Sequence, residues 1–255
     1  MSAELELVVA RYAERVEWTR HVPRSVRVTV YDKGGDLDAA DFPRATLVRL
    51  PNVGREAQTY LHHIVERFER PAALTVFCQG RPFDHAHDLH RVLRALAAGR
   101  ETVADFRWLG FTIDTDDPRG RRLFVRWTKN EDGRELRLDE FHRLLFGEPA
   151  PERVRFYPGA QFAVTAERIR SRPRAFWEHA RELAAAFPDA AHCFERLWDR
   201  LFGAVGVDEA LLGGRDCVYL KPIKRVPAGG PAGDDRAPAR PPPTGRSRWR
   251  RTCCR

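Results

Sequence analysis

The clearest hydrophobic periodicity of the chain lies between residues 57 and 68. Apolar side chains recur there at i, i+3, i+4, i+7, i+8 and i+11, namely at Ala57, Tyr60, Leu61, Ile64, Val65 and Phe68. This spacing places all of them on one face of a helix. We therefore expect a strongly amphipathic helix over this segment.

Alternating and continuous apolar runs predict strands on both sides of that helix. The expected strands are 5–10, 26–31, 45–50, 74–78 and 161–165. Further helices are expected at 88–98, 138–146, 173–186 and 190–202, and a short helix that ends at residue 172 follows the last strand. Strands that alternate with helices are typical of an α/β fold. We predict a single layered domain with a mostly parallel central sheet and a more helical C-terminal half. Residues 114–130 are expected to form an irregular inserted loop or hairpin.

Charge is distributed unevenly along the chain. The formal net charge is +8, and residues 226–255 contribute seven arginines against Asp234 and Asp235. This segment is also rich in proline and glycine, so we expect a disordered tail after an α/β domain at 1–225. The body carries no concentrated basic stripe, and we expect no specific nucleic-acid partner.

No segment of the sequence is apolar enough to suggest a membrane span, which needs about 18 consecutive apolar residues. Residues 1–10 lack the basic and apolar regions of a signal peptide. A cytoplasmic protein is the expectation.

Polar side chains and glycines follow four of the expected strands, at residues 10–12, 31–35, 51–56 and 79–85. Open α/β sheets bind their ligands at the carboxyl ends of the strands. The sequence therefore predicts a binding site at that edge of the sheet.

The third of these strand ends opens the amphipathic helix with Asn52, Gly54 and Arg55. The backbone N–H groups and dipole of a helix N-terminus attract anions, and an arginine can hold a phosphate with two hydrogen bonds. Gly54 would let a ligand approach the backbone closely. An asparagine cap, a glycine turn and a surface pair of Arg55 with Glu56 explain the same residues equally well.

Candidate metal ligands gather after the fourth strand, at Asp84, His85, His87, Asp88 and His90. A His-x-His pair beside an aspartate can hold a divalent cation. The spacing matches no recognised ligand set, however, and Asp88 is well placed to cap the next helix.

Two later segments carry polar groups in apolar surroundings. Gly159 and Gln161 form the entry to a strand, and Gln161 could contact a substrate or face solvent at the strand start. Glu195 and Trp198 are three residues apart and so share a helical face. A carboxylate beside an aromatic ring suits a sugar, although a core tryptophan beside a solvent-facing glutamate is the simpler interpretation.

Read together, these segments resemble the family called domain of unknown function 3431. The resemblance rests on residues 8–12, 31–35, 50–64, 75–85, 158–164 and 195–198, and it covers about residues 5–205. The family name implies no activity.

The chain is also distantly similar to nucleotide-sugar glycosyltransferases of the GT-A fold. That resemblance implies that Asp32 contacts the base or ribose, and that Asn52, Gly54, Arg55 and Gln79 face the donor and its diphosphate. Gly159, Gln161 and Trp198 would lie on the acceptor side. Glu195 would deprotonate the acceptor hydroxyl.

One departure from the GT-A pattern concerns the metal. Those enzymes end their fourth strand in Asp-x-Asp, whereas this chain has Gln79 to His85 there. Arg55 and Arg81 could neutralise the diphosphate instead, or Asp84 and His85 could hold a displaced divalent metal. The sequence Asp114-Thr115-Asp116 spells the pattern, but it lies in the expected irregular insertion and is interpreted as coincidence.

The function expected from these residues is transfer of a sugar from a nucleotide sugar to a small or glycan acceptor. Two other functions stay open. One is a metal-dependent enzyme built on Asp84, His85 and His87. The other is a non-catalytic nucleotide- or carbohydrate-binding protein. No cofactor is required by this interpretation, and a divalent metal is the one candidate.

Overall fold

A computed structural model describes residues 4–127 and 132–220, so the expected tail at 226–255 lies outside the described residues. The strands are β1 (Leu5–Arg11), β2 (Val26–Asp32), β3 (Ala45–Arg49), β4 (Leu74–Gln79), β5 (Phe106–Trp108), β6 (Thr112–Asp116), β7 (Val154–Phe156), β8 (Phe162–Thr165) and β9 (Cys217–Tyr219). The α-helices are α1 (Arg55–Glu66), α2 (Leu89–Ala97), α3 (Phe124–Trp127), α4 (Leu138–Phe146), α5 (Ala166–Arg170), α6 (Arg174–Ala186) and α7 (Ala190–Leu201). Short 3-10 turns occur at Glu17–His21, Ala39–Asp41, Pro82–Asp84 and Glu209–Leu212. In this part of the chain, every helix is too short or too polar to cross a membrane.

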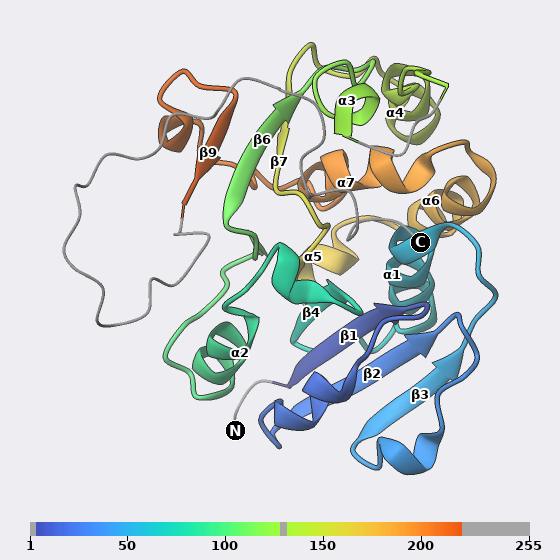
Figure 1. Cartoon of the computed structure of the whole chain (residues 1–255), viewed down its shortest axis with the longest axis vertical. Coiled ribbons are helices and arrows are strands. Elements are labelled where there is room, and N and C mark those ends of the chain that lie inside the picture. Colours follow the sequence, from blue (N-terminus) through green and yellow to red (C-terminus); the bar gives the residue numbers. More distant parts are fainter. Residues whose placement is uncertain (1–3, 128–131, 221–255) are drawn as a thin grey trace.

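The main sheet has six strands in the order β3-β2-β1-β4-β8-β5. The first four are parallel, and β8 runs antiparallel to both β4 and β5. Figure 1 shows the arrowheads of β1, β2 and β3 pointing to the same edge of the sheet, on the side where α1 lies. The prediction of an α/β fold with a mostly parallel central sheet is confirmed.

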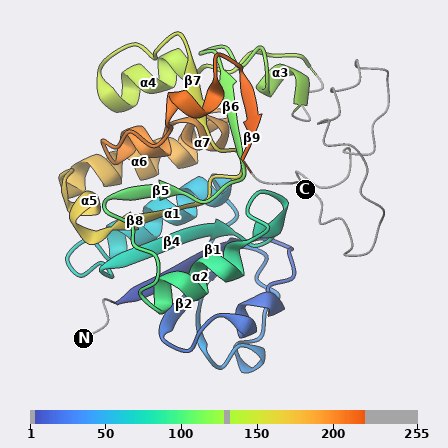
Figure 2. The same cartoon turned by 90° about the vertical axis from the view of Figure 1, so that its left-hand side faces the viewer.

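Each face of the sheet is covered by helices because the central strand β1 is apolar on both sides. Val8 and Ala10 point into the core that also holds the apolar face of α1, and α6 and α7 pack behind that helix. Leu7 and Val9 point into a second core shared with α2. Figure 2 shows α1 and α2 on opposite faces. A strand buried on both faces is the pattern of a central parallel strand.

A second, antiparallel sheet of three strands, β7-β6-β9, lies beyond the main one (Figure 1). Its strand β6 contains Asp114-Thr115-Asp116, so the expectation of an irregular segment there is wrong for these residues. Ladder bonds to strands about 40 and 100 residues further on, such as the pairing of Asp114 with Cys217, order this short segment. Ile113 of β6 is buried in the same core as α1 and α7.

Candidate functional site

The turn that precedes α1 is held by a lysine at the end of the neighbouring strand. The Lys33 ammonium donates hydrogen bonds to the carbonyl oxygens of Val53 and Arg55, and the residue is only 8% exposed. Burial lowers the pKa of Lys33 to about 8, although the nearby Glu56 carboxylate opposes that shift. Lys33 thus ties the end of β2 to the start of α1.

Gly54 is required in that turn for packing as well as for conformation. Its φ is +61°, and a Cβ at this position would lie 2.3 Å from the carbonyl oxygen of Ala184 in α6. The missing side chain therefore accommodates helix α6, whereas the sequence suggested that it made room for a ligand. Arg55 follows with a φ of 51° and a side chain that is 47% exposed.

Helix α7 brings a histidine and a glutamate to this arginine. The Nη1 atom of Arg55 lies 3.3 Å from Nε2 of His192, and Nδ1 of His192 lies 4.0 Å from Oε2 of Glu195. Burial lowers the pKa of His192 to about 4, against the attraction of Glu195. The ring is therefore neutral at pH 7 and can accept a hydrogen bond from the Arg55 guanidinium.

Glu195 is fixed from the other side by the strand entry that the sequence singled out. The backbone N–H of Gly159 donates to Oε1 of Glu195 at 2.7 Å, and Nη1 of Arg196 lies 3.7 Å from Oε2. The ring of His85 packs on Gly159, where a Cβ would come within 2.5 Å of it. The turn before β8 and the segment after β4 thus lie beside this carboxylate of α7, which is 21% exposed.

A second carboxyl group lies at the same place. Burial raises the pKa of Glu56, and the charge of Glu195 adds to that shift, whereas Arg55 and Lys33 oppose it. Lys33, Arg55, Glu56, His192 and Glu195 together are called the Arg55–Glu195 cluster below. It combines two carboxyl groups with two cations and a neutral imidazole.

Three members of the cluster were missed by sequence reasoning as site residues. The sequence pattern marks Lys33 and Glu56 only as parts of polar strand-end segments and does not single out His192. A signal for His192 was present, because it lies one helical turn before Glu195 and so shares its face. Lys33 is one of only four lysines in the chain.

Backbone strain is concentrated around the cluster. In the described residues, positive φ angles outside glycine occur at Arg55, Ala160 and Asp189. Ala160 follows Gly159, and Asp189 precedes the first residue of α7. The Asp189 carboxylate accepts two hydrogen bonds from Arg134, at 3.0 and 2.9 Å. Such conformations cost roughly 1–3 kcal/mol each and often occur at functional sites.

Asp32 does not reach the cluster. Its carboxylate is fully buried, with Nη1 of Arg11 at 2.7 Å and the backbone N–H groups of Gly34 and Leu37 both at 3.1 Å. Burial alone would raise the pKa of Asp32, but the hydrogen bonds from Arg11 and Leu37 outweigh it and lower the pKa. Asp32 shapes the loop after β2, and a contact with a base or ribose stays a prediction.

Two residues assigned to the acceptor side lie in the interior. Trp198 is fully buried, with its ring 5.0 Å from that of Phe162. Gln161 is also buried and donates to the carbonyl oxygen of Pro82 at 2.9 Å, which ties β8 to the turn after β4. Of the other donor-side residues, Asn52 is exposed and Gln79 is half-buried at the end of β4.

The side chains proposed to hold a metal are directed to other partners. Asp84 pairs with Arg81 at 3.2 Å, and the ring of His87 lies 4.9 Å from that of Phe111. Asp116 is buried against Arg196, whose Nη2 and Nε atoms lie 2.7 and 3.2 Å from Oδ2. Among residues 4–127 and 132–220, no group of three His, Cys, Asp or Glu side chains is arranged to hold a metal ion. These donors do not fit the metal that the GT-A resemblance implies.

Comparison with known proteins gives one family match and distant structural likenesses. No curated protein matches the chain. The structure of 4-diphosphocytidyl-2C-methyl-D-erythritol synthase from Anaerococcus prevotii DSM 20548 is 13% identical, with a TM-score of 0.38 over 81% of this chain and 87% of that one. A CMP:2-keto-3-deoxy-manno-octonic acid synthetase complexed with CTP is 13% identical, with a TM-score of 0.35 over 78% of this chain and 86% of that one. The family model described as protein of unknown function (DUF3431) matches residues 7–211, and the chain belongs to that family.

Proposed function

We propose that the Arg55–Glu195 cluster binds the diphosphate of a nucleotide sugar and transfers its sugar to an acceptor hydroxyl. Nucleotide and acceptor identity are left open. Under this proposal the protein is a transferase of the GT-A type that works at the carboxyl edge of its main sheet. A cytoplasmic location and a domain boundary at residue 225 stay predictions.

The observation that carries the proposal is the approach of Arg55 to His192 and, through it, to Glu195. An exposed guanidinium at the start of α1 and an anchored carboxylate on α7 belong to one cluster, although they were assigned separately to the leaving group and to the base. Anion binding and proton abstraction are thereby available at the same place. The carboxyl edge of a parallel sheet is also the usual ligand edge of an open α/β fold.

Each member of the cluster has a role in this reaction. As the bond from the anomeric carbon to the diphosphate oxygen breaks, negative charge grows on that oxygen, and Arg55 stabilises it. The acceptor oxygen bonds to the anomeric carbon and gives its proton to Glu195. Lys33 holds the turn that presents Arg55. The neutral His192 orients the guanidinium.

The proposed reaction uses no metal ion for the leaving group. Asp84 and His85 belong to no group of three or more candidate metal ligands in the described chain, and Asp116 is paired with Arg196. We therefore assign the charge of the diphosphate to the cations of the chain itself, chiefly Arg55.

A binding panel tests the proposal. The full chain is titrated calorimetrically with nucleoside diphosphates, with and without magnesium and with a chelator. We expect saturable binding of at least one diphosphate that persists in the chelator. Binding that requires metal would contradict the proposal that Arg55 neutralises the diphosphate. Failure of every nucleoside diphosphate to bind would contradict the proposed transferase function. Diphosphate binding without turnover of any nucleotide sugar would favour the non-catalytic alternative.

A further inference from the structure

A pocket of about 380 Å³ lies at the far end of α7 from the Arg55–Glu195 cluster. The cluster uses His192 and Glu195 in the first half of that helix, whereas the pocket opens beside Asp199 and Arg200 in its last turn. Its volume is within the range of roughly 300–1,000 Å³ that is typical of small-molecule sites. None of its lining residues belongs to the cluster.

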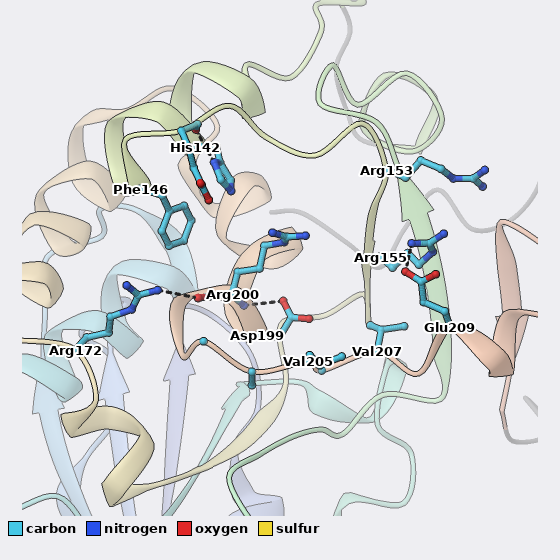
Figure 3. Close-up of a pocket in the computed structure, with 14 residues that line it drawn as sticks. His142, Phe146, Arg153, Arg155, Arg172, Asp199, Arg200, Val205, Val207 and Glu209 are labelled. Atoms are coloured by element: carbon cyan, nitrogen blue, oxygen red, sulfur yellow. Dashed lines mark hydrogen bonds and ion pairs between the residues drawn. The ribbon is translucent and has the colours of Figure 1, made fainter.

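Four arginines from separate segments line this pocket. Arg153 and Arg155 come from the edge that β7 forms, Arg172 from the connection between α5 and α6, and Arg200 from α7. Figure 3 shows Arg172 and the β7 pair on opposite sides, with Arg200 between them. They outnumber the carboxylates of the lining, which are Glu148, Asp199 and Glu209.

The arginines differ in how their charge is compensated. Arg155 pairs with Glu209 and Arg153 with Asp216, so these two are already neutralised. Arg172 donates to the carbonyl oxygens of Leu201 and Arg200 at 3.3 and 3.5 Å and lies over the ring of Phe176, 4.9 Å from its centre. It forms no ion pair with a described residue, so its charge is not neutralised by a carboxylate.

Arg200 is the arginine best placed to bind a ligand. Its exposed guanidinium makes no hydrogen bond or ion pair within the described part of the chain. Asp199 beside it is buried, accepts the backbone N–H of Arg200 at 2.8 Å and attracts the charge of Arg200 without forming an ion pair with it. Positive charge is therefore available in the half of the pocket that contains Arg172 and Arg200.

The rest of the lining is apolar enough to hold more than an inorganic anion. Phe146 and Val207 line the pocket, and so does Val205, a residue that is 97% exposed. A phosphate group has the charge and acceptor oxygens that guanidiniums bind best. An attached organic group would cover the exposed valine.

From this arrangement we infer a second ligand site, which takes a small phosphate monoester. The phosphate binds Arg200 and Arg172, and the organic group lies against Val205 and Val207. This site is independent of the function proposed for the Arg55–Glu195 cluster.

Calorimetric titration of the full chain with phenyl phosphate and with inorganic phosphate tests the inference. We expect saturable binding of phenyl phosphate, with inorganic phosphate weaker. Arg200→Gln should weaken phenyl phosphate at least about tenfold, the effect of losing one charge-assisted hydrogen bond. The melting temperature should change little, because the exposed Arg200 side chain makes no hydrogen bond or ion pair in the described chain and acts on Asp199 only through its charge.

A control variant separates this site from general charge effects. Arg24→Gln removes another exposed arginine with no hydrogen bond or ion pair in the described chain and should leave the affinity unchanged. Absence of saturable binding, or equal binding by Arg200→Gln and the unchanged chain, would overturn the site. Equal affinities for the two probes would overturn the assignment of an ester.

Discussion

Arg55 and His192 are separated by 137 residues in the sequence, yet their side-chain nitrogens lie 3.3 Å apart. The contact joins the start of α1 to the first turns of α7. It depends on the Lys33 ammonium, which holds the turn before α1, and on Gly54, which lets that turn pack on α6. A surface arginine is thereby positioned beside the carboxylate of Glu195.

The first prediction concerns the affinity for a nucleoside diphosphate. Arg55→Ala should weaken binding by about 1.5–3 kcal/mol, because it removes a charge-assisted hydrogen bond to the diphosphate. The free energy of unfolding should change little, since about half of this side chain is exposed. Titration calorimetry measures the affinity. Arg94→Ala, an exposed arginine of α2 on the other face of the sheet, is the matched control and should bind normally. A destabilised Arg55→Ala with normal affinity would make Arg55 a structural residue.

The second prediction concerns the turn itself. Gly54→Ala should lower the free energy of unfolding by roughly 2–5 kcal/mol, because the new methyl group meets the Ala184 carbonyl in a left-handed conformation. Gly99→Ala is the control, with a φ of +66° and no atom within 4 Å of the new Cβ. Gly99→Ala should lower the free energy of unfolding only by the cost of holding alanine in a left-handed conformation, about 1–2 kcal/mol. Urea unfolding compares the two. Equal losses would show that packing against α6 is unimportant.

Sequence periodicity predicted most of the main sheet because its strands are long and buried and its helices amphipathic. The expected and observed limits of α1 and of β1 to β4 differ by at most a few residues. Strands β5, β7 and β9 have three residues each, too few for a local pattern. Strand β6 contains polar residues and pairs with strands that are distant in sequence, so local periodicity does not predict it.

The candidate site was predictable only in part, for a related reason. Strand-end chemistry identified Arg55, and helical spacing identified Glu195, since both signals are local. The exposure of a side chain is not local. Asp32 and Trp198 occupy the expected segments but are buried, because Arg11 and the aromatic core reach them from other elements. The partnership with His192 depends on how α1 and α7 pack and has no signature in either segment alone.

The third prediction concerns the pH dependence of the free energy of unfolding that His63, a buried residue of α1, produces. Burial lowers the pKa of His63 to about 4, against the attraction of Glu6. The unfolded chain, with a histidine pKa near 6.5, therefore binds a proton in a range where the folded chain does not. The stability contributed by neutral His63 is complete above pH 6.5 and is lost as the pH falls toward 4, at up to about 1.4 kcal/mol per pH unit.

Comparing the unchanged protein with His63→Gln isolates the contribution of His63 to the pH dependence of stability. His192 titrates with the same sign as His63, whereas burial raises the pKa of Asp199 to about 6, so that Asp199 stabilises the fold as the pH falls. Both contributions cancel in the difference between the two proteins. Urea unfolding between pH 6.5 and 5, above the titration of Glu6, should show a flatter pH dependence for the variant. Parallel curves would mean that His63 titrates normally in the folded chain.

The last prediction separates catalysis from binding at Glu195. Glu195→Gln keeps an oxygen that can accept the Gly159 N–H, so the fold and the affinity for nucleoside diphosphate should be preserved. The amide cannot take the acceptor proton, and turnover should fall by about 10²–10⁴-fold. Nucleotide-sugar turnover is followed by release of the nucleoside diphosphate. Glu182→Gln, an exposed glutamate on the neighbouring helix α6, is the control and should retain full turnover. If Glu195→Gln turns over as fast as this control, Glu195 is not the base, and the Arg55–Glu195 cluster is then a binding site whose carboxylate serves only to orient His192 and Arg55.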